Sequence, residues 1–129
     1  MMKTLGIGVD IINHRRIKPL LKNKNFINRI FSKKEIYISK KVINKTNYFS
    51  KRFAGKEAFV KALGTGFRDN LNFKDVEIVN NQLGKPYYLI NKKIKKIIKK
   101  KMKVNNFELF LSISDEKDYS VAFTIIQKI

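Results

Sequence analysis

Two carboxylates in the sequence have neighbours that suit phosphate chemistry. Asp10 ends a stretch in which glycines alternate with apolar residues, and Glu57 precedes Lys61 by four positions. Two such carboxylates can hold Mg²⁺ at about 2.0–2.1 Å while the ion also binds phosphate oxygens of a substrate. Arg52, Lys56 and Lys61 would neutralise the remaining charge of that substrate. The pattern therefore predicts a site for a phosphate compound and a metal ion.

Each carboxylate also has a purely structural interpretation. Asp10 could end the strand or cap the segment that follows. Glu57 and Lys61 could form an ordinary i,i+4 ion pair on a solvated helix face. The residue pattern leaves both alternatives open. Because the chain has no cysteine and one histidine, a metal site would need oxygen ligands, which favours a hard cation such as Mg²⁺.

The elements that would position these groups are a strand and a helix. Residues 5–12 alternate in the period of a strand, so we expect the apolar face to be buried and Gly6 and Gly8 to admit a close neighbour. Apolar residues at helical spacing predict an amphipathic helix that follows a turn at 44–47 and ends at Gly64 and Gly66. By angle, Lys56 falls among the apolar positions of this helix and needs a partner.

The rest of the chain predicts a scaffold of mixed type. Asn13 can cap a first helix that Pro19 interrupts, and Ser32 with Glu35 fits a capping box. Residues 73–79 and 87–90 predict a hairpin, 91–103 a basic helix, and 107–114 and 119–125 two antiparallel strands. Together these elements predict one compact unit of helices and antiparallel strands, in a single domain over 1–129.

The composition restricts the kinds of partner that the protein can have. A net charge of +19 over 129 residues favours a polyanionic partner, although chains rich in Lys, Asn and Ile are also produced by AT-rich genes. No apolar run is long enough to cross a bilayer, and the N-terminal residues show no export signal. We therefore expect a cytoplasmic protein without a membrane partner.

Four segments resemble the holo-[acyl-carrier-protein] synthases, the short members of the 4'-phosphopantetheinyl transferase family. They are GIGVDI at 6–11, RFAGKEAFVKALGTG at 52–66, GKP at 84–86 and SISD at 112–115. The resemblance implies Mg²⁺-dependent transfer of 4'-phosphopantetheine from coenzyme A to a serine hydroxyl of apo-acyl carrier protein. The other product would be adenosine 3',5'-bisphosphate, and the holo-carrier would serve fatty acid biosynthesis.

The resemblance also implies roles for single residues. Asp10 and Glu57 match the metal ligands of the family, and Lys61 matches a residue that contacts the pyrophosphate. These residues form the expected catalytic group, in which Glu57 takes the serine proton directly or through water. Residues on motifs that line the coenzyme site are Arg52, Lys56, Gly64 and Lys85. Arg16 falls on the basic first helix, which in the family receives the acidic carrier protein.

The family has an α+β fold, with antiparallel strands packed on a long central helix. It forms a homotrimer in which neighbouring subunits share each active site, so the resemblance implies the same fold and assembly here. One position departs from the pattern. Many members carry histidine where this chain has Asp115, and a carboxylate would repel phosphate, so Asp115 is left out of the predicted site.

A nucleic-acid-binding module is the rival interpretation. The net charge and the lysine-rich helix at 91–103 favour it. Against it, the chain has no known DNA or RNA motif, and no aromatic residues are interleaved with its basic runs as a stacking platform. We therefore expect no nucleic acid partner.

Overall fold

The computed structural model describes residues 2–68 and 70–129, and its centre is helix α4 (Lys45–Leu63). The side chain of Asn44 caps α4 by accepting a hydrogen bond from the backbone N of Asn47, 3.0 Å away. The helix ends at Gly64, whose φ of 82° only glycine adopts at little cost. The predicted helix is confirmed, but it begins within the expected turn, and most of its length is buried on several sides rather than along one stripe.

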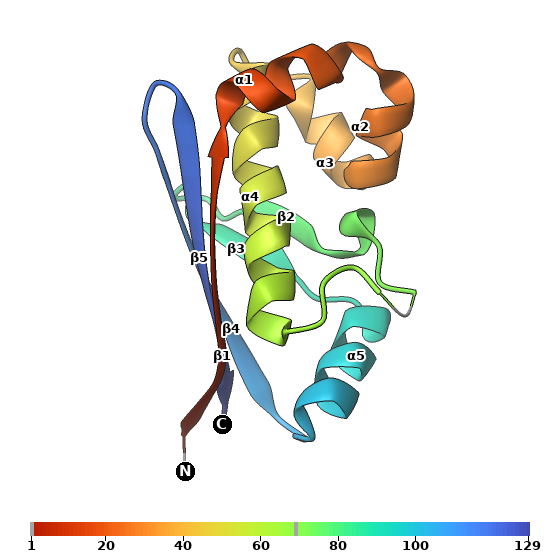
Figure 1. The fold of residues 1–129 in the computed structure, drawn as a ribbon, viewed down its shortest axis with the longest axis vertical. Helices are drawn as coiled ribbons and strands as arrows, with labels where there is room; N and C mark the ends of the chain where they lie inside the picture. The colour runs from red at the N-terminus through yellow and green to blue at the C-terminus, as the bar shows by residue number, and fades with distance from the viewer. Residues whose placement is uncertain (1, 69) are drawn as a thin grey trace.

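A three-stranded antiparallel sheet covers one side of α4 (Figure 1). Its strands are β1 (Lys3–Asn13), β4 (Phe107–Asp115) and β5 (Tyr119–Lys128), and their spatial order is β1-β5-β4. The strands predicted at both ends of the chain are therefore confirmed. Asp10 lies opposite Ala122 of β5, which is completely buried beneath α4.

The expected orientation of β1 is wrong. Ile7, Val9 and Ile11 are 57%, 52% and 61% exposed, whereas Gly8 on the opposite face is buried against α4. Alternation locates the two faces of a strand but does not say which one meets the rest of the same chain. The outward face of β1 is consequently apolar.

Short helices cover the end of α4 that is nearest its N-terminus. They are α1 (His14–Ile17), the 3₁₀ turn η1 (Lys18–Lys22), α2 (Lys24–Ile30) and α3 (Lys33–Ser39). Pro19 lies in η1, so the predicted interruption of the first helix is confirmed. The capping box of Ser32 and Glu35 is also present.

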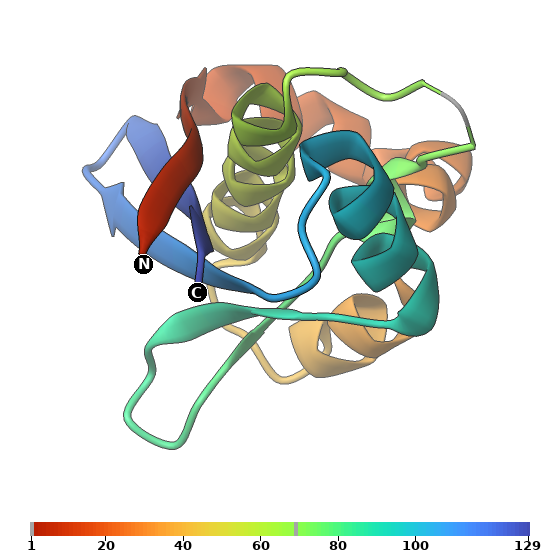
Figure 2. The same cartoon turned by 90° about the horizontal axis from the view of Figure 1, so that it is seen from below.

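The remaining elements pack on the side of α4 away from β1. They are η2 (Phe73–Asp75), β2 (Glu77–Asn80), β3 (Pro86–Leu89) and α5 (Lys92–Met102). The predicted strand begins at Glu77 rather than Phe73, because a 3₁₀ turn takes the first positions. Figure 2 shows the β2–β3 hairpin extending away from the body of the protein. None of the helices in the described part is long and apolar enough to span a membrane.

Candidate active site

Asp10 and Lys61 meet between β1 and α4. The Lys61 ammonium donates to Asp10 Oδ1 at 3.0 Å and to the carbonyl oxygen of Val9 at 3.1 Å. The Asp10 side chain is 15% exposed and that of Lys61 is 53% exposed. The site is thus a shallow surface site that a ligand can reach.

Glycines bring this carboxylate to the helix. A Cβ atom on Gly8 would lie 1.9 Å from the carbonyl oxygen of Ala58, and one on Gly6 would lie 2.0 Å from that of Ala62. Only a strand without side chains at these positions can lie directly on the α4 backbone. The close neighbour that the sequence predicted beside the glycines is therefore α4 itself.

Glu57 is partly buried, and its surroundings disfavour its charge. Burial is the largest cause that raises its pKa above the usual value, and the negative charge of Asp10 is the second. The charges of Lys61 and Arg16 act in the opposite direction. The two predicted metal ligands therefore lie close enough to repel each other.

The donor set fits a hard divalent cation. Asp10 and Glu57 offer carboxylate oxygens, which Mg²⁺ prefers, and a cation between them would offset their repulsion. Groups of three or more Asp, Glu, His or Cys side chains able to hold a metal do not occur in the described part of the chain. Mg²⁺ commonly uses one or two carboxylates together with substrate phosphates and water.

Gly64 lies along the same face of α4. Glu57, Lys61 and Gly64 are spaced at i, i+4 and i+7, which places them in one row along the helix. Gly64 is exposed, and open space surrounds the position where a Cβ would stand. A ligand could therefore lie along this row without meeting a side chain at its far end.

Arg52 belongs to a different part of the surface. Its guanidinium stacks 3.8 Å from the ring of Tyr48 and donates to the side chain of Asn80 on β2. Burial lowers the pKa of Arg52 from its usual value, and Tyr48 and Glu35 oppose this. Within the described residues, Arg52 Nε has no hydrogen-bond partner, although the side chain is only 5% exposed.

Lys85 lies near this second group. Asn80 donates to the carbonyl oxygen of Gly84 at 2.7 Å, which links Arg52 to the turn that carries the exposed Lys85. Lys85 also lines a groove of about 540 Å³ on the outer face of the sheet, with Phe110 and Phe123. In one chain, Arg52 and Lys85 are thus separated from Asp10, which faces α4.

The assignment of Lys56 to the coenzyme site is wrong. Its side chain is fully buried, and its ammonium donates to Glu35 Oε1 at 2.7 Å and to the carbonyl oxygens of Val76 at 2.6 Å and Phe73 at 3.1 Å. All three donors of the ammonium are used. Lys56 therefore holds the fold together and is not accessible to a ligand.

The partner of Lys56 is Glu35, which the sequence predicts only as part of a capping box. The capping box is confirmed, since Glu35 Oε1 accepts from the backbone N of Ser32 at 2.9 Å. The same carboxylate also accepts from Lys56 and, through Oε2, from the backbone N of Ile78 at 3.0 Å. The demand of Lys56 for a partner was visible in the sequence, but the identity of that partner was not.

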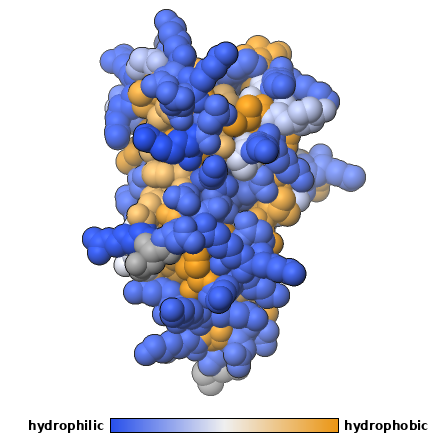
Figure 3. Space-filling model, turned by 90° about the vertical axis from the view of Figure 1, so that its right-hand side faces the viewer, coloured by the Kyte–Doolittle hydropathy of each residue, from blue (hydrophilic) through white to orange (hydrophobic). Residues whose placement is uncertain are grey.

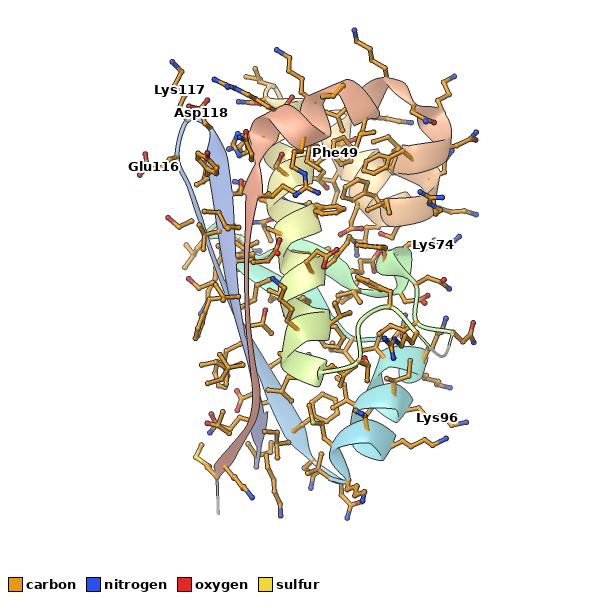
Figure 4. The ribbon with its side chains drawn as sticks, in the orientation of Figure 1. Phe49, Lys74, Lys96, Glu116, Lys117 and Asp118 are labelled. Atoms are coloured by element: carbon orange, nitrogen blue, oxygen red, sulfur yellow. The ribbon has the colours of Figure 1, made fainter. Side chains whose placement is uncertain are left out.

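Two further positions occupy ordinary structural roles. His14 Nε2 lies 2.7 Å from Ser120 Oγ, at the junction of α1 and β5. Asp115 accepts from the side chain of Asn47, at the end of β4. Figure 4 shows the neighbouring turn, with Glu116, Lys117 and Asp118 at the tip of the β4–β5 hairpin.

Comparison with known proteins identifies the class of this site. The family model of the 4'-phosphopantetheinyl transferase superfamily matches residues 6–124. The holo-[acyl-carrier-protein] synthase of Pelagibacter ubique is 61% identical over 127 residues, covering 98% of this chain and 99% of its own. The chain therefore belongs to the 4'-phosphopantetheinyl transferase superfamily and, within it, to the holo-[acyl-carrier-protein] synthases. It is accordingly an enzyme.

Solved structures of the same group share the fold. The synthase from Neisseria meningitidis is 35% identical with a TM-score of 0.86, covering 96% of this chain and 98% of its own. The synthase from Bacillus anthracis, described in complex with CoA (3',5'-ADP), is 31% identical with a TM-score of 0.82 and full coverage of both chains. The predicted α+β fold is thereby confirmed.

Proposed function

We propose that this chain transfers 4'-phosphopantetheine from coenzyme A to a serine hydroxyl of apo-acyl carrier protein, releasing adenosine 3',5'-bisphosphate. The observation that carries the proposal is the group formed by Asp10, Lys61 and Glu57, with the raised pKa of Glu57. The relative from Bacillus anthracis, described in complex with CoA, supports coenzyme A as the substrate. The reaction would take place in the cytoplasm and serve fatty acid biosynthesis.

Asp10 and Glu57 would hold Mg²⁺, since both supply the oxygens that this ion prefers. When bound, the ion would neutralise charge that develops on the pyrophosphate of coenzyme A. Lys61 lies beside Asp10 and would contribute a second positive charge from the protein itself. Gly64 would leave room for the substrate along the same helix face.

Glu57 would accept the proton of the attacking serine, directly or through water. Because a bound Mg²⁺ would lower the basicity of the Glu57 carboxylate, a water relay is the expected form of this proton transfer. Lys61 would keep the phosphate positioned for in-line attack, because its exposed ammonium can turn from Asp10 to a phosphate oxygen.

Arg52 and Lys85 would complete the coenzyme site from a neighbouring subunit. They lie away from Asp10 within one chain, and Arg52 keeps an unused buried donor. The outer face of the sheet is apolar and carries Val9 opposite Phe123, which are 52% and 41% exposed. Exposed apolar faces of this kind mark interfaces between proteins, and this supports a homotrimer with shared sites.

The first helix would receive the acidic carrier protein. Arg15 and Arg16 are exposed on α1, and the charge of Arg16 reaches Glu57. A carrier protein bound there would therefore lie next to Glu57, which is the proposed base for its serine. Basic residues at this place would mainly increase the rate of association with an acidic partner.

The proposed function is tested by measuring the transfer of phosphopantetheine to the carrier protein. The purified chain would be incubated with coenzyme A, apo-acyl carrier protein and Mg²⁺, and the mass of the carrier would be followed. The wild type should add phosphopantetheine, and Asp10→Asn should slow the transfer at least about 100-fold, as expected for loss of a group that stabilises developing charge. Transfer by Asp10→Asn at the wild-type rate would refute the proposed site.

A further inference from the structure

Helix α5 carries a row of lysines that the transferase function does not use. Six of them line an open groove of about 560 Å³ together with Val104 and Asn105: Lys92, Lys95, Lys96, Lys99, Lys100 and Lys103. Helix α5 lies near the C-terminal end of α4, at the opposite end of the molecule from α1 (Figure 1). It is therefore separate from the proposed carrier surface.

Within residues 2–68 and 70–129, these charges have no counterions. The ion pairs formed by the described residues are Lys56–Glu35, Lys61–Asp10 and Lys93–Asp75, and none includes a lysine of the groove. Figure 4 shows Lys96 extending away from the protein, and Figure 3 shows that this side of the molecule is largely hydrophilic. An anion from solution could therefore reach the groove freely.

The arrangement also opposes the stability of the helix. Lys92, Lys96 and Lys100 follow one another at i,i+4 spacing, where like charges repel. The first turn contains no acidic residue, so the positive end of the helix dipole faces lysines, whereas Lys99, Lys100 and Lys101 in the last turn face its favourable negative end. A bound polyanion would offset the repulsion between neighbouring lysines.

The shape of the row favours a chain of phosphates over a membrane surface. From Lys92 to Lys103 it extends about 16 Å at the helical rise of 1.5 Å per residue. The apolar side of α5 is turned inward, with Ile94 and Ile98 at 1% and 0% exposure and Ile97 and Met102 partly buried against the core, so little apolar surface is left to enter a bilayer. A linear row of lysines along an open groove suits a linear polyanion.

We propose that the α5 groove binds the phosphate backbone of a nucleic acid strand as a second activity. No aromatic side chain lines the groove, so nothing there can stack on bases. Binding would consequently be independent of sequence and strongly dependent on salt. The proposal departs from the expectation of no nucleic acid partner, because that expectation depended on the lack of a recognition motif and a stacking platform, and backbone binding needs neither.

The test compares two variants of equal net charge. Lys95→Gln/Lys96→Gln/Lys99→Gln removes three charges from the groove, and Lys33→Gln/Lys34→Gln/Lys40→Gln removes three exposed charges from α3 and the turn after it. Binding of a fluorescent oligothymidylate to the full chain would be measured by anisotropy over a range of salt concentrations. None of these residues belongs to the proposed transferase site, so carrier modification should remain at the wild-type rate in both.

The groove variant should bind more weakly and lower the slope of log K against log salt by about 2, because each phosphate contact on a single strand contributes about 0.7. The α3 variant should keep the wild-type slope. An equal loss in both variants would overturn the proposal, because net charge alone would then explain binding. It would also be overturned if poly-glutamate or phosphatidylglycerol vesicles bound the wild type as tightly as the oligonucleotide.

Discussion

The ammonium of Lys56 lies 2.7 Å from Glu35 Oε1, and neither side chain is exposed to solvent. This ion pair joins the start of α3 to the middle of α4. Through the same ammonium and carboxylate it also holds η2 and the beginning of β2. Glu57 is the next residue of α4, so the pair fixes the rotation of the helix that presents a predicted metal ligand to β1.

Removing the charge of Lys56 should therefore be costly. Lys56→Met leaves the Glu35 carboxylate buried without its cation, and the free energy of unfolding should fall by about 3–5 kcal/mol. Urea denaturation followed by circular dichroism measures this. The double variant with Glu35→Gln should recover much of the loss, because both charges are then absent.

The matched control is Lys61→Met, which breaks a largely exposed ion pair and should cost less than about 1 kcal/mol. If Lys56→Met were as stable as this control, the buried pair would not contribute as described.

Replacing Glu57 should stabilise the metal-free protein at neutral pH. The folded-state pKa of Glu57 is raised, so its favourable contribution is complete below the unfolded pKa and is lost as pH rises through the folded pKa. Metal-free Glu57→Gln should consequently melt at a higher temperature than the wild type at neutral pH. The difference should shrink as the pH approaches about 4, the ordinary range of glutamate.

Differential scanning calorimetry across this pH range measures the effect. A variant that melted below the wild type at neutral pH would contradict the conclusion that burial and the charge of Asp10 disfavour the ionised form of Glu57.

A methyl group at Gly8 should separate strand and helix. Its Cβ would lie 1.9 Å from the carbonyl oxygen of Ala58, so β1 must move away from α4. Gly8→Ala should cost about 1–3 kcal/mol of stability and weaken Mg²⁺-dependent binding of coenzyme A. Thr4→Ala, at an exposed position of the same strand, is the control for chemical denaturation and calorimetry. If Mg²⁺ strengthened coenzyme A binding in Gly8→Ala as much as in the wild type, the close approach of β1 to α4 would not be what positions Asp10.

The outer face of the sheet should hold copies of the chain together. Val9 and Phe123 lie opposite each other on this face, and Val9→Asp should dissociate a trimer into monomers in analytical ultracentrifugation. Ile43→Asp is the control, because Ile43 is fully exposed elsewhere and its replacement should leave the assembly unchanged. A monomeric wild type would refute the shared site, and so would equal dissociation by Ile43→Asp.

Much of this organisation could be predicted from local sequence, because it depends on local rules. The cap at Asn13, the interruption at Pro19, the capping box at Ser32 and the helix end at Gly64 each follow from a few adjacent residues. The glycines of β1 likewise predicted a close approach beside Asp10, and α4 makes that approach.

What could not be predicted depends on distant contacts. The buried partner of Lys56 lies on another helix, and no local rule connects it with Glu35. The alternation of residues in β1 predicts a buried apolar face, but it is the same whether that face packs on its own chain or on another chain. The outward orientation of this face therefore cannot be predicted from the strand itself. Arg52 shares a motif with Glu57 in sequence, yet its side chain bonds to Asn80 of β2 rather than lying beside Asp10.

Binding of coenzyme A in the presence and absence of Mg²⁺ tests the central claim most directly. Titration calorimetry should show that Mg²⁺ tightens coenzyme A binding at least about 10-fold in the wild type, and that Asp10→Asn and Glu57→Gln each remove this gain. If Mg²⁺ tightened binding equally in the wild type and in both variants, these two carboxylates would not hold the ion against the substrate.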